Sequence, residues 1–474
     1  MKKIIHLFIR VTLLICFLFL EKAAFAQTVN QKLKIAFSKF ENDNQLKNAI
    51  SSLYVVDATS GQIVFDKNSR IGLPPASTQK IITSITALEL LGNDFQYKTE
   101  IGYEGNVVNG TLFGNLFITG SGDPTLGSWR WKTTKEDSVL NRMLQAIHAK
   151  GIYKINGNIC VDISAWETNS QNDAWIWQDI GNYYGAGLSA LMWRENQFDV
   201  HLKSGKNIGD SVIIKGYTPN LYGVNFQSHL TSAARGTGDN AYIYIFPREI
   251  KGTIPVSEND FVISGAMPNA HFQLASTLSD SLNSNKEVIG IHSEIIEDVK
   301  NSKRLKYQNS KIVLHTEVSP TLDSIIYWFN KKSVNLYGEA LLKTLAFQKE
   351  NFGSTEEGIQ VLKKFWKQNA IEEDELNIWD GSGLSPLNRV TTHAQVEILK
   401  YAQSKSWFPT FLNALPEHNN MTMKSGTIRG VKGFCGYHKA KNGKEYIFSF
   451  LVNNYSGSAT TLVNKMYQVL DNLK

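Results

Sequence analysis

The chain has 474 residues, of which 42% are hydrophobic and 19% are charged, and its formal net charge is +6. This length is more than one hydrophobic core usually organises, so we expect a globular protein of two or more domains. The weak positive charge suits peripheral contact with an anionic wall or membrane but does not imply nucleic acid, and three cysteines exclude a disulfide-rich scaffold.

The N-terminus indicates a secretory signal peptide over residues 1–26. Lys2 and Lys3 precede a mostly apolar stretch, and Ala24-Phe25-Ala26 offers a cleavage site before Gln27. An uncleaved membrane anchor is the alternative, although the apolar run is short for a membrane span. Either interpretation predicts an exported, periplasmic or cell-envelope protein. Cys160 and Cys435 lie beyond this segment, and the sequence does not decide whether they pair.

Residues 27–94 predict a hairpin followed by a helix. Residues 50–66 alternate as two strands around a turn at residues 57–61. Pro74-Pro75-Ala76 then leads into Ser77 and an apolar helical run that Gly92 ends. Ser77 is therefore expected at the N-terminus of a buried helix.

Residues 95–308 differ, with short predicted strands, turn dipeptides such as Asn109-Gly110 and many aromatic side chains. Helical periodicity returns in residues 309–474, together with strands predicted near residues 421–424, 433–439 and 446–453 and a last helix near 460–473. We therefore expect an α+β domain, formed by residues 27–94 and 309–474, that a long β-rich insertion interrupts.

The first catalytic candidates are Ser77 and Lys80, in the only segment where a lysine follows a serine after three residues. On a helix these positions share a face, so the hydroxyl and the amine can touch. A serine needs a neighbouring base to become a nucleophile, and a lysine can be that base if burial or nearby cations keep it partly neutral. An N-cap serine beside a solvated lysine gives the same pattern, so this motif alone is not decisive.

Ser333-Val334-Asn335 is predicted in a turn between two helices. Ser333 could pass a proton to a leaving amine, and Asn335 could bind a substrate carbonyl. The same Ser-x-Asn spacing recurs at residues 170–172 and 257–259, which we interpret as loops.

Lys424-Ser425-Gly426-Thr427 is predicted at a strand bordering a cleft. Lys424, Ser425 and Thr427 could hold a substrate carboxylate, and the backbone N–H groups of Ser77 and Thr427 could form an oxyanion hole. A second Lys-Ser-Gly at residues 203–205 precedes the Ser-x-Asn motif and lies in the insertion, so we interpret it as a decoy.

The ordered set of Ser-x-x-Lys, Ser-x-Asn and Lys-Ser-Gly occurs in penicillin-binding proteins and serine β-lactamases. From about residue 45 onward the chain resembles the class C low-molecular-weight penicillin-binding proteins, the D-alanyl-D-alanine carboxypeptidases of peptidase family S13. Similar blocks are residues 333–343, the Asp-Gly-Ser-Gly-Leu-Ser signature at 380–385, and residues 120–126 and 182–187 of the insertion.

This resemblance implies a penicillin-binding, serine β-lactamase-like transpeptidase fold and a serine DD-carboxypeptidase or DD-endopeptidase acting on peptidoglycan stem peptides, with no cofactor. Catalysis would pass through an acyl-enzyme at Ser77, which β-lactam antibiotics would trap as inhibitors. Two departures leave the side-chain preference of the substrate open. Pro386 stands where the family often has an arginine, with Arg389 the nearest one, and Arg429 follows Thr427 at a variable position.

Several other residues have structural interpretations beside functional ones. Asp162 and Trp166 could contact the peptide stem but suit packing, and Asp380 suits a turn. Trp175 and Trp177 could stack on sugars, although aromatic clusters usually pack in cores. The histidines lack metal-ligand spacing, so no metal site is expected.

Two rival functions remain at this stage. A β-lactamase or general esterase could use the same residues, but no deacylating glutamate motif is recognisable. A wall-binding scaffold that has lost its catalysis would show degenerate motifs, whereas Ser77, Lys80, Asn335 and Lys424 are all present. The balance between carboxypeptidase and endopeptidase activity and the oligomeric state stay open.

Overall fold

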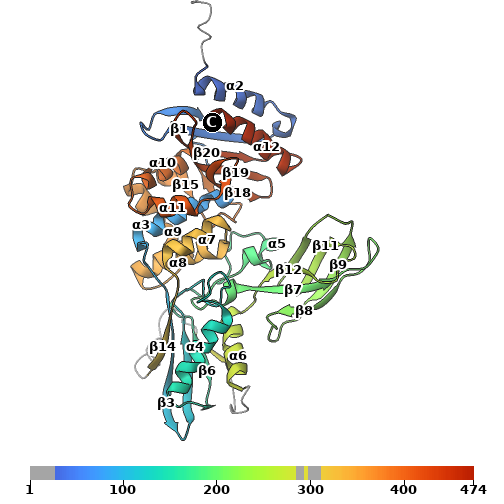
Figure 1. The fold of residues 1–474 in the computed structure, drawn as a ribbon, viewed down its shortest axis with the longest axis vertical. Coiled ribbons are helices and arrows are strands. Elements are labelled where there is room, and N and C mark those ends of the chain that lie inside the picture. The colour runs from blue at the N-terminus through green and yellow to red at the C-terminus, as the bar shows by residue number, and fades with distance from the viewer. Residues whose placement is uncertain (1–26, 284–292, 297–310) are drawn as a thin grey trace, which may run out of the picture.

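The structure is a computed structural model that describes residues 27–283, 293–296 and 311–474. Figure 1 shows an elongated body with an arm that projects from its middle. The predicted signal peptide, residues 1–26, lies outside the described residues. Among the helices of the described segments, none has the length and apolar character that crossing a bilayer requires.

A six-stranded sheet joins the two ends of the chain. Its strand order is β17-β18-β19-β20-β1-β2. The corresponding bounds are Glu417–His418, Met421–Ile428, Val431–Lys439, Glu445–Asn453, Ile50–Asp57 and Ile63–Lys67. The hairpin predicted at residues 50–66 is confirmed, because β1 and β2 pair antiparallel with Val55 opposite Phe65. Strand β1 also pairs along its length with β20, so segments distant in sequence share this sheet.

Helices cover both faces of this sheet. Helices α2 (Val29–Glu41) and α12 (Ala459–Leu470) lie together over one face, at the end of the body that Figure 1 shows uppermost. Since side chains alternate along a strand, β1 contributes Val55 to the apolar cluster beneath these helices and Val56 to the cluster on the other face. The sheet is therefore buried on both sides.

The second face packs against a helical layer that contains the nucleophile candidate. Its helices are α3 (Lys80–Leu91), α7 (Leu322–Lys331), α8 (Asn335–Glu350), α9 (Thr355–Gln368), α10 (Thr392–Gln403) and α11 (Phe408–Ala414). A 3₁₀ turn, η2 (Ala76–Gln79), leads into α3, and Gly92 ends this helix with a φ of 84°. The predicted end at Gly92 is confirmed, whereas the α-helix begins at Lys80 and Ser77 lies in the preceding 3₁₀ turn.

The insertion is built on a second sheet with the order β13-β6-β4-β3-β14, and β5 pairs with β4. The bounds are Ser293–Ile296, Ile159–Asp162, Thr111–Thr119, Lys98–Val108, Ile312–Val318 and, for β5, Lys154–Asn156. Because β14 pairs antiparallel with β3, this sheet continues past residue 308, where the sequence placed the end of the insertion. Helices α4 (Glu136–Ala149) and α6 (Ala270–Asn283) also belong here, and the β-rich interpretation missed them.

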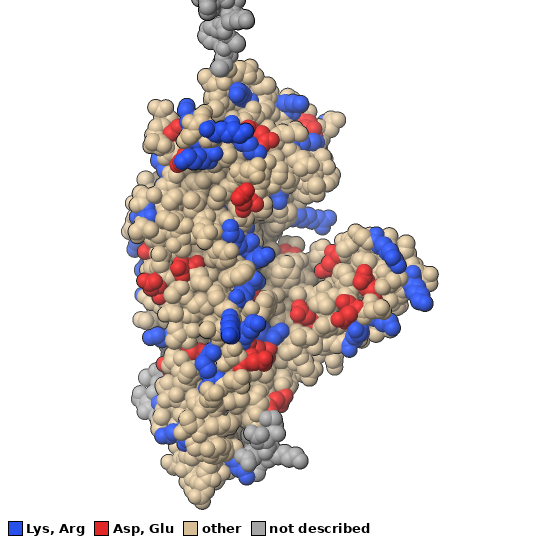
Figure 2. All heavy atoms as spheres, viewed as in Figure 1, with Lys and Arg blue, Asp and Glu red and all other residues tan. Residues whose placement is uncertain are grey.

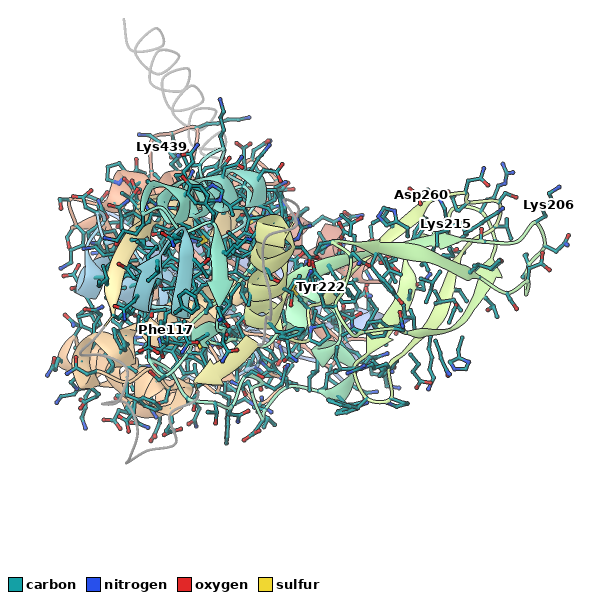
Figure 3. All side chains as sticks on the ribbon, turned by 90° about the horizontal axis from the view of Figure 1, so that it is seen from below. Phe117, Lys206, Lys215, Tyr222, Asp260 and Lys439 are labelled. Carbon is teal, nitrogen blue, oxygen red and sulfur yellow. The ribbon has the colours of Figure 1, made fainter. Side chains whose placement is uncertain are left out.

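The projecting arm consists of two small sheets, β10-β11-β9 and β12-β7-β8. Their strands are Asn240–Tyr244, Glu249–Pro255, Gln227–Ala233, Phe261–Ala266, Gln197–Lys203 and Ile213–Thr218. Figure 3 shows Lys206, Lys215 and Asp260 on the outer part of the arm, and Figure 2 shows a hollow between arm and body. The base of the arm therefore borders the body beside this hollow.

Candidate active site

A cleft of about 1160 Å³ brings the predicted motifs together. Ser77, Ser333, Asn335 and Thr427 line it, although they come from three separate segments of the chain. The insertion and the arm supply the opposite wall with Arg130, Asp179, Tyr183, Tyr184 and Tyr242.

Ser77 stands in the turn that precedes α3. Ala76 before it has a φ of 48°, and both Ala76 and Thr78 are fully buried while Ser77 is only partly so. The buried neighbours fix the turn, so the Ser77 hydroxyl faces the cleft from a rigid position.

Lys80 is fully buried beside this hydroxyl. Its Nζ lies 3.0 Å from Ser77 Oγ, 2.7 Å from Asn335 Oδ1 and 2.6 Å from the backbone oxygen of Ser382. Burial, helped by the charge of Lys424, holds the pKa of Lys80 well below its usual range, although Asp380 and Glu339 oppose this shift. A neutral amine has two N–H donors for the two carbonyl oxygens, which leaves its lone pair for the Ser77 hydroxyl.

Asn335 is held by both ends of its amide. This residue is the first of α8. Its Nδ2 donates a hydrogen bond to the backbone oxygen of Tyr184 at 2.8 Å, so its Oδ1 faces Lys80. The contact with Tyr184 links the Ser77 and Lys80 region to the insertion.

Ser333 and Lys424 form a second lysine–hydroxyl pair. Ser333 lies in the turn between α7 and α8 with a φ of 56°, and Lys424 lies on β18 with 2% of its surface exposed. Lys424 Nζ is 3.0 Å from Ser333 Oγ and 3.0 Å from the backbone oxygen of Ser425. Burial lowers the pKa of Lys424 to about 8, so the ammonium form still dominates at neutral pH.

Strand β18 runs directly against the turn that holds Ser77. A Cβ atom on Gly426 would lie 2.9 Å from Ser77 N and 2.7 Å from the backbone oxygen of Pro75, so only glycine allows this approach. Thr427, the next residue, is exposed at the cleft, where its hydroxyl accepts a hydrogen bond from Lys432 at 2.7 Å. The backbone of Ser77 and the carboxylate-binding candidates therefore lie side by side.

The loop at residues 380–385 contacts Lys80 through the backbone oxygen of Ser382. Asp380 is fully buried, and its carboxylate accepts hydrogen bonds from the backbone N–H groups of Gly383 and Ser385 and from Trp175 Nε1, at 2.8, 2.6 and 3.0 Å. Asp380 is thus a turn residue and Trp175 a packing residue, as expected. Ser382, whose carbonyl holds Lys80, belongs to a signature that the sequence showed, but its role was missed.

Three other residues that the sequence singled out, Asp162, Trp166 and Trp177, do not line the cleft. Trp166 is 1% exposed and fills the space beside Gly122 and Gly353, where a Cβ would lie 1.9 and 2.2 Å from its indole. Asp162 binds the Ser164 backbone N–H at 3.0 Å, a turn contact. Trp177 is 55% exposed, so the packing interpretation is wrong for this side chain.

Cys160 and Cys435, the two cysteines beyond the predicted signal peptide, are both buried, and Cys435 is a free thiol. The decoy segment 203–205 closes strand β7 in the arm and is not part of the cleft lining.

Two departures from the family pattern have clear positions. Pro386 and Arg429 both line the cleft, whereas Arg389 binds the backbone oxygens of Pro386 and Asn388 at 2.7 and 2.8 Å. The cleft residue Arg130, which the sequence did not reveal, is paired with the fully buried Glu195 at 2.7 Å. No local motif marks Arg130, because its partner lies 65 residues further along the chain.

Comparison with known proteins agrees with this geometry. The D-alanyl-D-alanine carboxypeptidase DacB of Haemophilus influenzae is 25% identical over 421 residues, which cover 83% of each chain. A D-alanyl-D-alanine carboxypeptidase of Actinomadura sp. is 24% identical over 465 residues, 89% of this chain and 81% of the relative.

The fold is also that of a solved relative. The crystal structure of penicillin-binding protein 4 (dacB) from Haemophilus influenzae matches with a TM-score of 0.77 at 22% identity, covering 92% of this chain and 98% of that one. This match confirms the predicted penicillin-binding fold. The sequence model of one family spans residues 33–473. The chain therefore belongs to the D-Ala-D-Ala carboxypeptidase 3 (S13) family, as its motifs predicted, and is a serine-type D-Ala-D-Ala carboxypeptidase.

Proposed function

We propose that this enzyme hydrolyses D-alanyl bonds of peptidoglycan stem peptides through an acyl-enzyme at Ser77, as a DD-carboxypeptidase and also as a DD-endopeptidase. The observation that carries the proposal is the position of Lys80 Nζ, 3.0 Å from Ser77 Oγ and held by two carbonyl oxygens. This arrangement suits a neutral lysine that removes the serine proton.

In the acylation step, Ser77 Oγ attacks the carbonyl carbon of the penultimate D-alanine while Lys80 takes the hydroxyl proton. The N–H groups of Ser77 and Thr427 would hold the oxyanion of the tetrahedral intermediate. Collapse of this intermediate breaks the peptide bond, and Ser333 relays the proton held by Lys80 to the leaving amine, so that both residues return to their starting protonation states. Water then attacks the ester, which frees the shortened peptide and restores Ser77.

The substrate carboxylate would bind Lys424, Ser425 and Thr427. Lys424 supplies the positive charge, because its ammonium form dominates below a pKa of about 8. Asn335 lies at the cleft surface with its amide fixed, which suits contact with a peptide carbonyl of the stem. In endopeptidase substrates the leaving amine belongs to a second stem peptide, and the volume of the cleft, about 1160 Å³, gives room for it.

Three further features complete the proposal. Residues 1–26 would export the enzyme to the envelope, where its substrate lies. Weak electrostatic contact with an anionic wall or membrane would follow from the positive charge. β-Lactam antibiotics would acylate Ser77 and inhibit the enzyme, and the Haemophilus influenzae penicillin-binding protein 4 of the same fold has been solved in complex with a β-lactam.

The test uses mass spectrometry of a pentapeptide monomer and a cross-linked dimer after incubation with residues 27–474, as wild type or as Ser77→Ala. Release of one D-alanine, or conversion of the dimer to monomers, by the wild type alone supports the proposal. Rapid turnover of penicillin with no peptide cleavage would instead favour a β-lactamase. If neither protein changes any substrate, a wall-binding scaffold replaces the hydrolase.

A further inference from the structure

Glu339 lies behind the nucleophile pair and has no part in the mechanism above. It follows Asn335 by one turn of α8, so the two side chains share a helix face. Its side chain is buried with 2% exposed, and its Oε2 accepts a hydrogen bond from the backbone N–H of Gly381 at 2.9 Å. The buried group thus holds the loop whose next residue, Ser382, offers its carbonyl to Lys80.

Two buried oxygens meet at this point without hydrogen bonds of ordinary geometry. In the described part of the chain, neither Glu339 Oε1 nor Ser382 Oγ has a hydrogen-bond partner. The Ser382 side chain is nevertheless close enough to influence the pKa of the Glu339 carboxyl group. Buried polar atoms are nearly always paired in native proteins. A hydrogen bond between these two oxygens satisfies both of them.

The charges around Glu339 determine the protonation state of its carboxyl group. Asp380 is beside it on the loop, Lys80 faces it from α3, and Lys424 on β18 acts on Lys80. Two carboxyl groups in one dry site do not both ionise readily, and a carboxyl group with few hydrogen-bond donors takes up a proton more readily. Asp380 accepts from the Gly383 and Ser385 N–H groups, Trp175 and Asn388, whereas Glu339 has one hydrogen bond of ordinary geometry, from the N–H of Gly381, beside the nearby Ser382 side chain.

We propose that Glu339 is a positioning residue that stays a neutral carboxylic acid at neutral pH, donates its proton to Ser382 Oγ, and thereby leaves Lys80 as a free amine. The inference deepens the proposed function, because it rests on the roles given there to Ser77 and Lys80. Burial, with the neighbouring Asp380, raises the pKa of Glu339 to about 8 although the Gly381 N–H, the Ser382 side chain and the charge of Lys80 all lower it, and this pKa agrees with a protonated group at pH 7.

The neutral state has a direct consequence for catalysis. An ionised Glu339 would stabilise the ammonium form of Lys80, which has no lone pair for the Ser77 proton. A protonated Glu339 exerts no such attraction, and it fixes the Ser382 loop by two hydrogen bonds instead of one. The residue would therefore keep Lys80 both oriented and basic without touching the substrate.

Infrared difference spectroscopy on residues 27–474 tests the protonation state directly. The spectrum of wild type minus Glu339→Gln at pH 7 should contain the carbonyl stretch of a protonated carboxylic acid, and this band should vanish as the pH rises through about 8. Ser382→Ala should keep the band but shift it, because the proton loses its acceptor. Glu375→Gln is the matched control and should remove no such band, since Glu375 is 5% exposed but hydrogen-bonded to His393 and Thr391, which lower its pKa.

Kinetics of D-alanine release separate this role from a merely structural one. Glu339→Gln should keep kcat/KM at pH 7 within about threefold of wild type, because glutamine preserves the neutral shape and one donor. In the pH profile of kcat/KM, the midpoint of the acidic limb should be the same in Glu339→Gln as in wild type. The inference is overturned if the band is missing and this midpoint falls by about one pH unit, since Glu339 would then be an ionised partner of Lys80.

Two further outcomes remain informative. If Glu339→Gln does not fold, the spectrum of wild type minus Ser382→Ala still tests the hydrogen bond, and an unshifted band overturns it. If wild type and Ser77→Ala both leave the peptides intact while the band is present, the proposed function fails and the assignment of Glu339 as a neutral acid stands.

Discussion

Lys424 Nζ lies 3.0 Å from Ser333 Oγ, which sets a second lysine–serine pair beside that of Lys80 and Ser77. The two lysines differ in how strongly their surroundings oppose a charge. Burial lowers the pKa of Lys80 far below its usual range, whereas the pKa of Lys424 falls to about 8. We therefore expect Lys80 to act as a base and Lys424 as a cation at neutral pH.

Replacement of Lys80 tests the base directly. Lys80→Arg and Lys80→Met should both lower the rate of acylation by penicillin about 10³-fold or more, because a guanidinium does not give up its proton and methionine has none to exchange. Intact-protein mass spectrometry over time measures this rate. Lys67→Arg, an exposed residue outside the cleft, is the control and should acylate like wild type. Normal acylation of Lys80→Arg would contradict the assignment.

The pH dependence of substrate binding tests Lys424. Its positive form exists below a pKa of about 8, so KM for a peptide with a free terminal carboxylate should rise as the pH increases through that value. A peptide whose terminal carboxylate is replaced by an amide should bind more weakly and show no such rise. Steady-state kinetics between neutral and alkaline pH measure both. Parallel KM profiles for the two peptides would remove Lys424 from carboxylate binding.

Asp380 should matter for stability as well as for activity. Asp380→Asn replaces an acceptor oxygen with an NH₂ group, so buried donors such as Trp175 Nε1 and the N–H of Ser385 lose their partner. We expect a loss of about 3 kcal/mol in the free energy of unfolding. Trp175→Phe, which removes the Nε1 donor but keeps a six-membered aromatic ring, should cost less, about 1 kcal/mol. Urea denaturation compares the two, and equal stabilities would show that Asp380 is not the centre of the loop.

Gly426 should be essential for the alignment of β18 with Ser77. A Cβ atom would meet Ser77 N at 2.9 Å and the Pro75 oxygen at 2.7 Å, so Gly426→Ala must push the strand away. A displacement of this kind should lower acylation by about 10²-fold. Gly216→Ala is the matched control, because a Cβ there meets nothing within 4 Å. Full activity of Gly426→Ala would mean that the oxyanion hole tolerates a shifted strand.

Local motifs were predictable from the sequence because their chemistry is local. Ser77 and Lys80 lie one helical turn apart, so their contact follows from helix geometry once the buried α3 is recognised. The carbonyl oxygens of Ser382 and Tyr184, which hold Lys80 and Asn335, were not predictable as partners. Every residue type has a backbone oxygen, so no side-chain pattern marks the one that is used.

The elements of the insertion were harder to predict from the sequence than these local motifs. Helix α4 has an amphipathic pattern, with Val139, Met143 and Ile147 buried, but it lies between predicted strands and was absorbed into the β-rich interpretation. Strand β14 was assigned to the wrong side of the boundary at residue 308 because its pairing with β3 spans more than 200 positions. Long-range pairing leaves little trace in a single sequence.

The sequence by itself determined the three ordered motifs, the hairpin, the nucleophile helix and the family to which the chain belongs, because each depends on residues close together or on their order. The tertiary structure alone decided how those motifs meet. Lys80 and Asn335 are 255 positions apart, yet the packing of α3 against α8 brings them to 2.7 Å. That packing also buries Lys80, Glu339 and Lys424, and burial is what changes the acidity of these groups.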